Sequence, residues 1–182
     1  MDPLLVVIDM QHVFADDDSP WRVPSCLDVV PAIERAAQAF GERVVFTRFV
    51  PFERPPSPGA WTDYYALHPF FLRPESARLV ELVEPFASWG VATLDAPTFS
   101  KQGPRLMELA GRDGTIVLCG VSTDCCVIST ALAAADAGLR VRVLRDACAG
   151  MTEAGHEAAL ALMAGYEGHI EISAVDEELG RR

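Results

Sequence analysis

The sequence predicts an α/β fold. About six mainly parallel strands, in the order 3-2-1-4-5-6, form the middle of a three-layer, doubly wound structure with helices on both faces. Short β-rich runs alternate with longer alanine-rich stretches of helical pattern along the 182 residues. Most of the β-rich runs are continuously apolar, as burial on both faces of a sheet requires. A glycine follows most of the helical stretches and is expected to end each helix.

The individual elements follow from these patterns. Six short apolar runs predict the strands Leu4–Ile8, Arg43–Thr47, Val91–Leu94, Thr115–Cys119, Arg140–Leu144 and His169–Ile172. Helical patterns predict helices at Asp28–Phe40, Glu75–Trp89, Pro104–Ala110, Asp124–Ala137 and Glu153–Ala164, with a last turn from Val175. No repeat or low-complexity tract interrupts this order.

The segment Phe49–Pro74 does not fit the alternation, because it is rich in both proline and aromatic residues. A loop of this length is usually functional or disordered. Its aromatic residues favour a structured lid or a subunit contact over disorder. The sequence leaves open whether the segment lines the pocket of its own chain or that of a neighbour.

Size and charge indicate a single domain over residues 1–182 that acts on a small molecule. The composition is 50% hydrophobic, which is enough for one good core. With 15 basic and 26 acidic residues the net charge is -11, and no Lys/Arg cluster breaks that balance. Nucleic acid and membranes are therefore not expected as partners.

The amino terminus and the cysteines indicate a cytoplasmic protein. No basic region precedes the apolar run Leu4–Ile8, which is too short for a signal peptide or a membrane span. The cysteines are odd in number and form no CxxC pair, so neither a disulfide framework nor a zinc site is expected. They are Cys26, Cys119, Cys125, Cys126 and Cys148.

The clearest chemical signal lies between Thr115 and Val127, where a buried strand runs through a tight turn directly into a helix. Cys126 falls in the first turn of that helix, where free N–H groups lower a thiol pKa and can hold an oxyanion. A buried core cysteine is the commoner role for this residue type. The adjacent Cys125 is a rival nucleophile, which we assign to packing because neighbouring helical residues point about 100° apart.

Two charged residues also follow predicted strands. Asp9 comes after Leu4–Ile8, where a buried carboxylate needs a partner, although capping the next helix is an equally good role for it. Lys101 lies just beyond the third strand and would alone be an ordinary exposed lysine. Ligands gather at the carboxyl ends of parallel strands, so Asp9, Lys101 and Cys126 are expected to converge there.

Three motifs carry a resemblance to a known family. They are Val7-Ile-Asp-Met-Gln11 with Phe14, Thr98-Phe-Ser-Lys101, and Gly120-Val-Ser-Thr-Asp-Cys-Cys-Val127. In this order they resemble the isochorismatase-like cysteine hydrolases, which include nicotinamidases, carbamoylsarcosine amidases and related amide and ureide hydrolases. The resemblance covers nearly the whole chain.

The resemblance implies a catalytic triad of Asp9, Lys101 and Cys126, with no cofactor. It also implies a cis peptide at Val121–Ser122, which shapes an oxyanion hole from the N–H groups of Ser122 and Cys126. The expected reaction is cleavage of a C–N bond in a small amide or ureide through an acyl-enzyme. Isochorismatase-type vinyl-ether hydrolysis is the alternative reaction, and a homo-oligomer, dimer or tetramer, is the expected assembly.

The sequence departs from the family pattern in one respect. Metal-containing nicotinamidases place an aspartate and several histidines around the second strand, whereas here only His12 and His68 are nearby, so no metal is expected. Arg48 or Arg54 could instead hold a substrate carboxylate, although a structural or solvated role is commoner for either. By position, the candidates for the pocket wall are Gln11, Phe14 and Trp21.

Two other classes of protein remain as alternatives. An aspartate after the first strand also serves phosphatases of the haloacid dehalogenase type, but the sequence after Asp9 lacks the second aspartate of such sites. The fold can also serve as a binding or scaffold module without catalysis. Reactivity of a low-pKa thiol would distinguish the enzyme from such a module.

Overall fold

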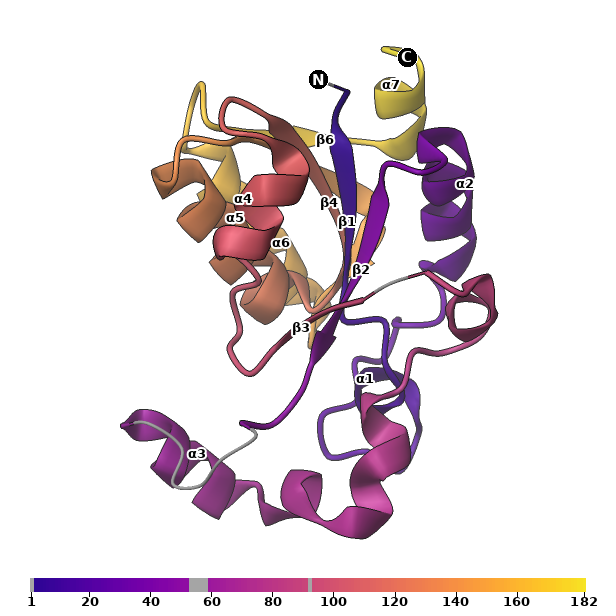
Figure 1. Cartoon of the computed structure of the whole chain (residues 1–182), viewed down its shortest axis with the longest axis vertical. Helices are drawn as coiled ribbons and strands as arrows, with labels where there is room; N and C mark the ends of the chain where they lie inside the picture. The colour runs from indigo at the N-terminus through magenta and orange to yellow at the C-terminus, as the bar shows by residue number, and fades with distance from the viewer. Residues whose placement is uncertain (1, 53–58, 92) are drawn as a thin grey trace.

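The computed structural model describes residues 2–52, 59–91 and 93–182, and Figure 1 shows their arrangement. The predicted fold class is confirmed: six parallel strands form one sheet in the order β3-β2-β1-β4-β5-β6. The strands are β1 (Leu4–Ile8), β2 (Val44–Phe49), β3 (Thr93–Ala96), β4 (Thr115–Val121), β5 (Arg140–Ala149) and β6 (Ile170–Ser173).

Helices cover both faces of the sheet (Figure 1). One face carries α2 (Val30–Phe40) and α7 (Val175–Leu179), and the other carries α4 (Pro104–Ala110), α5 (Ile128–Asp136) and α6 (Glu153–Ala164). The apolar face of α2 packs inward through residues such as Ile33 and Phe40. Among the described residues, no helix combines the length and the apolarity that crossing a membrane requires.

The middle of the sheet is the centre of the core. Every residue of β1 is buried, because β2 and β4 pair with its two edges and helices cover its two faces. At the carboxyl end of β1, Ile8 pairs with Gly120. A Cβ atom on Gly120 would lie 2.2 Å from the Ile8 carbonyl oxygen, so only glycine fits where the two backbones meet. This close approach sets the residues that follow β1 beside those that follow β4.

The predicted helix Glu75–Trp89 is wrong. The structure has two short 3-10 helices instead, Pro74–Val80 and Phe86–Trp89. Between them, the carbonyl of Glu81 accepts a hydrogen bond from His12, and the N–H of Val83 donates to Met10. The backbone here forms hydrogen bonds with the segment after β1 and not the i to i+4 hydrogen bonds of an α-helix. Pro85 also lacks the N–H that a helix would need.

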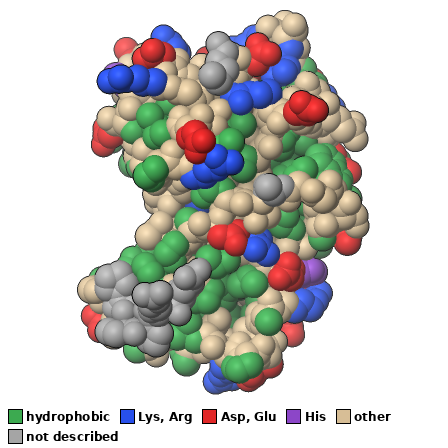
Figure 2. All heavy atoms as spheres, viewed as in Figure 1, with side chains coloured by type: hydrophobic (Ala, Val, Ile, Leu, Met, Phe, Trp, Pro, Cys, Tyr) green, Lys and Arg blue, Asp and Glu red, His purple; other side chains and the backbone are tan. Residues whose placement is uncertain are grey.

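The described part of the segment Phe49–Pro74 is ordered. It forms α3 (Ala60–Leu67) and a 3-10 helix (Pro69–Leu72), which the sequence pattern did not predict. A short helix α1 (His12–Ala15) after β1 was also missed. In Figure 1 these elements lie together below the carboxyl ends of the strands, and Figure 2 shows a hollow between this lower part and the upper body.

Candidate active site

Asp9 follows β1 directly and is fully buried. Its backbone has a φ of 48°, a left-handed conformation that aspartate tolerates better than most residues. One carboxylate oxygen, Oδ1, accepts a hydrogen bond of 2.6 Å from the hydroxyl of Thr47 on β2. The other, Oδ2, lies 2.8 Å from Nζ of Lys101. The buried carboxylate thus has both a hydrogen-bond donor and a cation.

Lys101 is held by several groups in the interior and is 2% exposed. Its Nζ donates to the carbonyl of Thr98 at 3.0 Å and lies 5.1 Å from the ring centroid of Phe49. The hydroxyl of Thr130 on α5 accepts from the Lys101 N–H and donates to the Cys126 carbonyl. One hydroxyl therefore links the backbone at Lys101 to the backbone at Cys126.

Cys126 lies in a π-helical turn, Thr123–Val127, that joins β4 to α5. Its thiol is buried and interacts electrostatically with both charges of the ion pair. A hydrogen bond with Cys125, burial and the negative charge of Asp9 raise its pKa well above the usual range, whereas Lys101 lowers it. The thiol is therefore neutral near pH 7 and needs a base in order to act as a nucleophile.

Cys125 packs against the core, as the sequence led us to expect, but the expectation that it faces away from the pocket of Cys126 is wrong. It is partly exposed and lines the same cavity as Cys126. The expectation assumed α-helical geometry, whereas the chain here forms a π-helical turn. The hydrogen bond with Cys126 lowers the pKa of Cys125, whereas the same bond raises the pKa of Cys126.

The turn before the cysteines brings further polar groups to the site. The Val121–Ser122 peptide bond is cis. The carbonyl of Ser122 accepts hydrogen bonds from the N–H groups of Cys125 and Val127, both at 3.1 Å. Ser122 itself is buried and lies at the cavity wall beside Cys126.

A cavity of about 180 Å³ opens above the two thiols. Five aromatic side chains form most of its wall: Phe14, Trp21, Phe49, Tyr64 and Phe99. Ser122, Cys125, Cys126 and Met151 complete the lining. Among the described residues that line the cavity, none has a side chain that is a cation or a carboxylate.

The aromatic wall belongs to the same chain as the thiols. Trp21 packs between the ring of Phe49 on β2 and the ring of Tyr64 on α3, with centroid distances of 5.9 and 5.6 Å. Its indole N–H donates to Nδ1 of His68 at 3.3 Å. The aromatic segment that the sequence singled out therefore contributes to the pocket of its own chain.

Besides Cys125, four residues of the lining were not predicted as pocket residues from the sequence: Phe49, Tyr64, Phe99 and Met151. Tyr64 belonged to the aromatic segment but was not singled out as a pocket residue; burial and the nearby thiols raise the pKa of its phenol. Met151 carries no recognisable signal. It reaches the cavity because β5 continues to Ala149, beyond its predicted end at Leu144.

Two predicted substrate-binding residues, Gln11 and Arg48, are bound to other parts of the protein and do not line the cavity. The Gln11 amide donates to the carbonyls of Phe49 and Val80, while its oxygen accepts from the Phe49 N–H. Gln11 is thus a buried link between backbone segments. The guanidinium of Arg48 binds Asp95 with two hydrogen bonds, at 2.9 and 2.7 Å, and does not line the cavity. Arg54 lies outside the described residues.

The described residues do not fit a metal site. His12 pairs with Asp16, and His68 accepts the indole N–H of Trp21. Within ranges 2–52, 59–91 and 93–182, no three His, Cys, Asp or Glu side chains are grouped so that they could share a metal ion.

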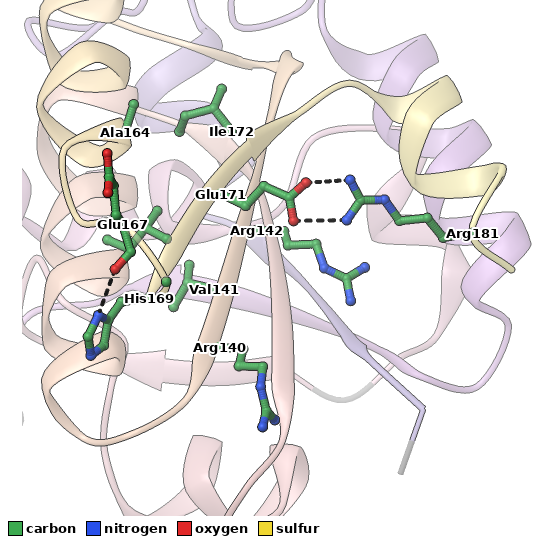
Figure 3. A pocket seen from close by; sticks show the side chains of 11 residues that line it. Arg140, Val141, Arg142, Ala164, Glu167, His169, Glu171, Ile172 and Arg181 are labelled. Carbon is green, nitrogen blue, oxygen red and sulfur yellow. Dashed lines mark hydrogen bonds and ion pairs between the residues drawn. The ribbon is translucent and has the colours of Figure 1, made fainter.

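A larger hollow of about 610 Å³ lies near the amino ends of β5 and β6 (Figure 3). Its cations are already engaged: Arg181 pairs with Glu171, Arg142 with Glu178, and Arg140 donates to the carbonyl of Asp113. Ligands of doubly wound folds bind at the opposite ends of the strands. The smaller cavity above the thiols is therefore the candidate active site.

The chain is similar to known proteins in both sequence and fold. A sequence model of the isochorismatase domain matches residues 3–174. The isochorismatase domain-containing protein 2 of Rattus norvegicus is 38% identical over 76 residues, which are 41% of this chain and 36% of that protein. The match therefore spans little more than a third of the length of that relative.

Solved structures share the fold over nearly their full lengths. A cysteine hydrolase from Pseudomonas syringae pv. phaseolicola 1448A has a TM-score of 0.84 and 24% identity, covering 98% of this chain and 91% of that one. The pyrazinamidase/nicotinamidase from Streptococcus mutans UA159 has a TM-score of 0.74 and 23% identity, covering 94% and 100%. Because the domain match extends over almost the entire sequence, the chain belongs to the isochorismatase family of hydrolases.

Proposed function

We propose that the protein is a cysteine hydrolase that cleaves a C–N bond of a small, uncharged amide or ureide through an acyl-enzyme. Cys126 is the nucleophile, Asp9 the general base and acid, and Lys101 the cation that stabilises the Asp9 carboxylate and the thiolate. One observation carries this proposal: the buried Asp9–Lys101 pair, 2.8 Å apart, lies beside a buried thiol at the wall of a cavity.

The chemistry follows from the protonation states. Because the pKa of the Cys126 thiol is raised, attack on the substrate carbonyl must transfer the thiol proton to Asp9 as the C–S bond forms. The N–H groups of Ser122 and Cys126 then stabilise the oxyanion. Asp9 returns the proton to the leaving nitrogen, the C–N bond breaks, and the acyl group remains on Cys126 as the acyl-enzyme. Asp9 then takes a proton from the water that attacks the thioester and gives it to the sulfur of Cys126 as the C–S bond breaks.

The cavity supports an uncharged substrate. At about 180 Å³ it lies below the roughly 300–1,000 Å³ of ordinary ligand pockets. Its aromatic walls would have to desolvate a carboxylate without a cation to pair with it, which is costly. Small neutral amides and ureides therefore fit the described lining better than isochorismate, which carries two carboxylates.

A substrate panel tests this proposal. Small neutral amides, ureides and isochorismate are each incubated with the protein, and released ammonia or pyruvate is measured. We expect ammonia from at least one neutral amide or ureide, and no pyruvate from isochorismate. Pyruvate release that depends on Cys126 would favour vinyl-ether hydrolysis instead. Absence of any turnover, together with an unreactive Cys126, would favour a binding module.

Arg48 provides a second test of the substrate class. We expect Arg48→Gln to change kcat/KM on the turned-over substrate by less than about threefold, because its guanidinium binds Asp95 rather than a ligand. The partly exposed ion pair contributes at most about 1 kcal/mol to stability. A rise in KM of tenfold or more, measured by initial rates, would instead mean that Arg48 binds a substrate carboxylate.

A further inference from the structure

The hydroxyl of Thr47 contacts Asp9 at two points. It donates to Oδ1 of the carboxylate at 2.6 Å and accepts from the Asp9 N–H at 3.2 Å. Thr47 is fully buried on β2 and is not one of the described residues that line the cavity. Any influence of Thr47 on the reaction must therefore pass through Asp9.

These two hydrogen bonds constrain the side chain of Asp9 relative to its own backbone. Because one hydroxyl binds both the N–H and Oδ1, rotation of the carboxylate would break the shorter bond. With Oδ1 occupied, Oδ2 is left to Lys101, 2.8 Å away. Apart from this ion pair, Oδ2 has no hydrogen-bond partner among the described residues, so it is the oxygen to which we assign the proton of Cys126.

We propose that Thr47 is a positioning residue that orients the Asp9 carboxylate through these two hydrogen bonds. The inference rests on the proposed role of Asp9 as general base. A hydrogen bond to a carboxylate favours its charged form, so loss of the donor favours protonation. The other titratable groups facing Asp9 are Lys101, which follows β3, and the thiols of Cys125 and Cys126, which follow β4.

The pH dependence of Cys126 alkylation tests the inference without a known substrate. The probe is iodoacetamide, which is uncharged, and a Cys125→Ala background leaves Cys126 as the only thiol lining the described cavity. Fragment spectra of the labelled peptide separate Cys126 from the buried Cys119. We expect Thr47→Val to move the acidic limb of the profile of alkylation rate against pH about one unit higher. At a given pH on that limb, this shift lowers the alkylation rate about tenfold.

Two variants serve as controls. Thr47→Ser keeps the hydroxyl and should stay within about threefold of the parent at every pH. Ser173→Ala removes another fully buried strand hydroxyl, at the far edge of the sheet on β6, and should leave the profile in place. If Thr47→Val does not fold, Thr47→Ala is used, with the same expected shift.

The outcomes separate the inference from the proposed function. Asp9→Asn should slow the alkylation of Cys126 at neutral pH by tenfold or more, and an unchanged rate would refute Asp9 as the base. If Asp9→Asn slows the reaction but the profiles of Thr47→Val and the parent superimpose, Thr47 is not a positioning residue. An equal shift in Ser173→Ala would also overturn the inference.

Discussion

Cys126→Ser is expected to abolish acyl-enzyme formation and to reduce turnover by on the order of a thousandfold or more. A serine hydroxyl is a much weaker acid than a thiol, so Asp9 cannot activate it to a comparable degree. The measurement is kcat on whichever substrate of the panel is hydrolysed, together with the mass of the protein trapped during turnover. A retained acyl adduct in Cys126→Ser would contradict the prediction.

Cys125→Ala is the matched control, because the two thiols lie side by side on one cavity. We expect this variant to lower kcat by less than about tenfold, because it removes a neighbour of the nucleophile and not the nucleophile itself. Alkylation alone does not distinguish the two residues. Cys125 is partly exposed and its pKa is lowered, so it should be labelled first. Full activity in Cys126→Ser with complete loss in Cys125→Ala would reverse the assignment.

Lys101→Met is expected to lower the free energy of unfolding by about 3–5 kcal/mol. Methionine replaces the lysine stem but leaves the carboxylate of Asp9 buried without a cation. Urea unfolding at neutral pH measures the loss. Activity should fall as well, because Asp9 loses the cation that orients its carboxylate.

A double variant separates charge from packing. Asp9→Asn combined with Lys101→Met removes both charges and should recover a large part of the stability lost in Lys101→Met. Asp9→Asn alone should also destabilise, since it leaves the buried ammonium unpaired. If the double variant loses as much free energy of unfolding as the two single variants lose together, the two charges have no interaction energy.

The fold was predictable because its signals are local. Continuous apolar runs such as Leu4–Ile8 identify interior strands, and the glycine after most helical stretches marks where helices end. The incorrect predictions lie where tertiary contacts determine the secondary structure. Glu75–Trp89 has helical periodicity, but its middle pairs with the segment after β1. The helix α3 was missed because prolines and aromatic residues mask its eight-residue pattern.

The residues of the candidate site also fall into those that local sequence signals predict and those that only tertiary contacts reveal. Asp9, Lys101 and Cys126 could be found because each follows a strand and carries an ionisable group. The roles of Gln11 and Arg48 could not, since their partners are backbone or side-chain groups distant in the sequence. Thr47 gave no signal at all. A threonine inside a β-rich run reads as an ordinary strand residue until the fold places it against a carboxylate.

The packing around Trp21 links the order of α3 to the shape of the cavity. An isolated helix of eight residues is unstable in water, so α3 depends on the rings of Tyr64 and Trp21 that hold it to the body. The same rings form the cavity wall. Amide hydrogen exchange of α3 and the affinity for a ligand therefore report one opening equilibrium. A ligand that fills the cavity slows exchange in a helix that contributes little more than one ring to the binding surface.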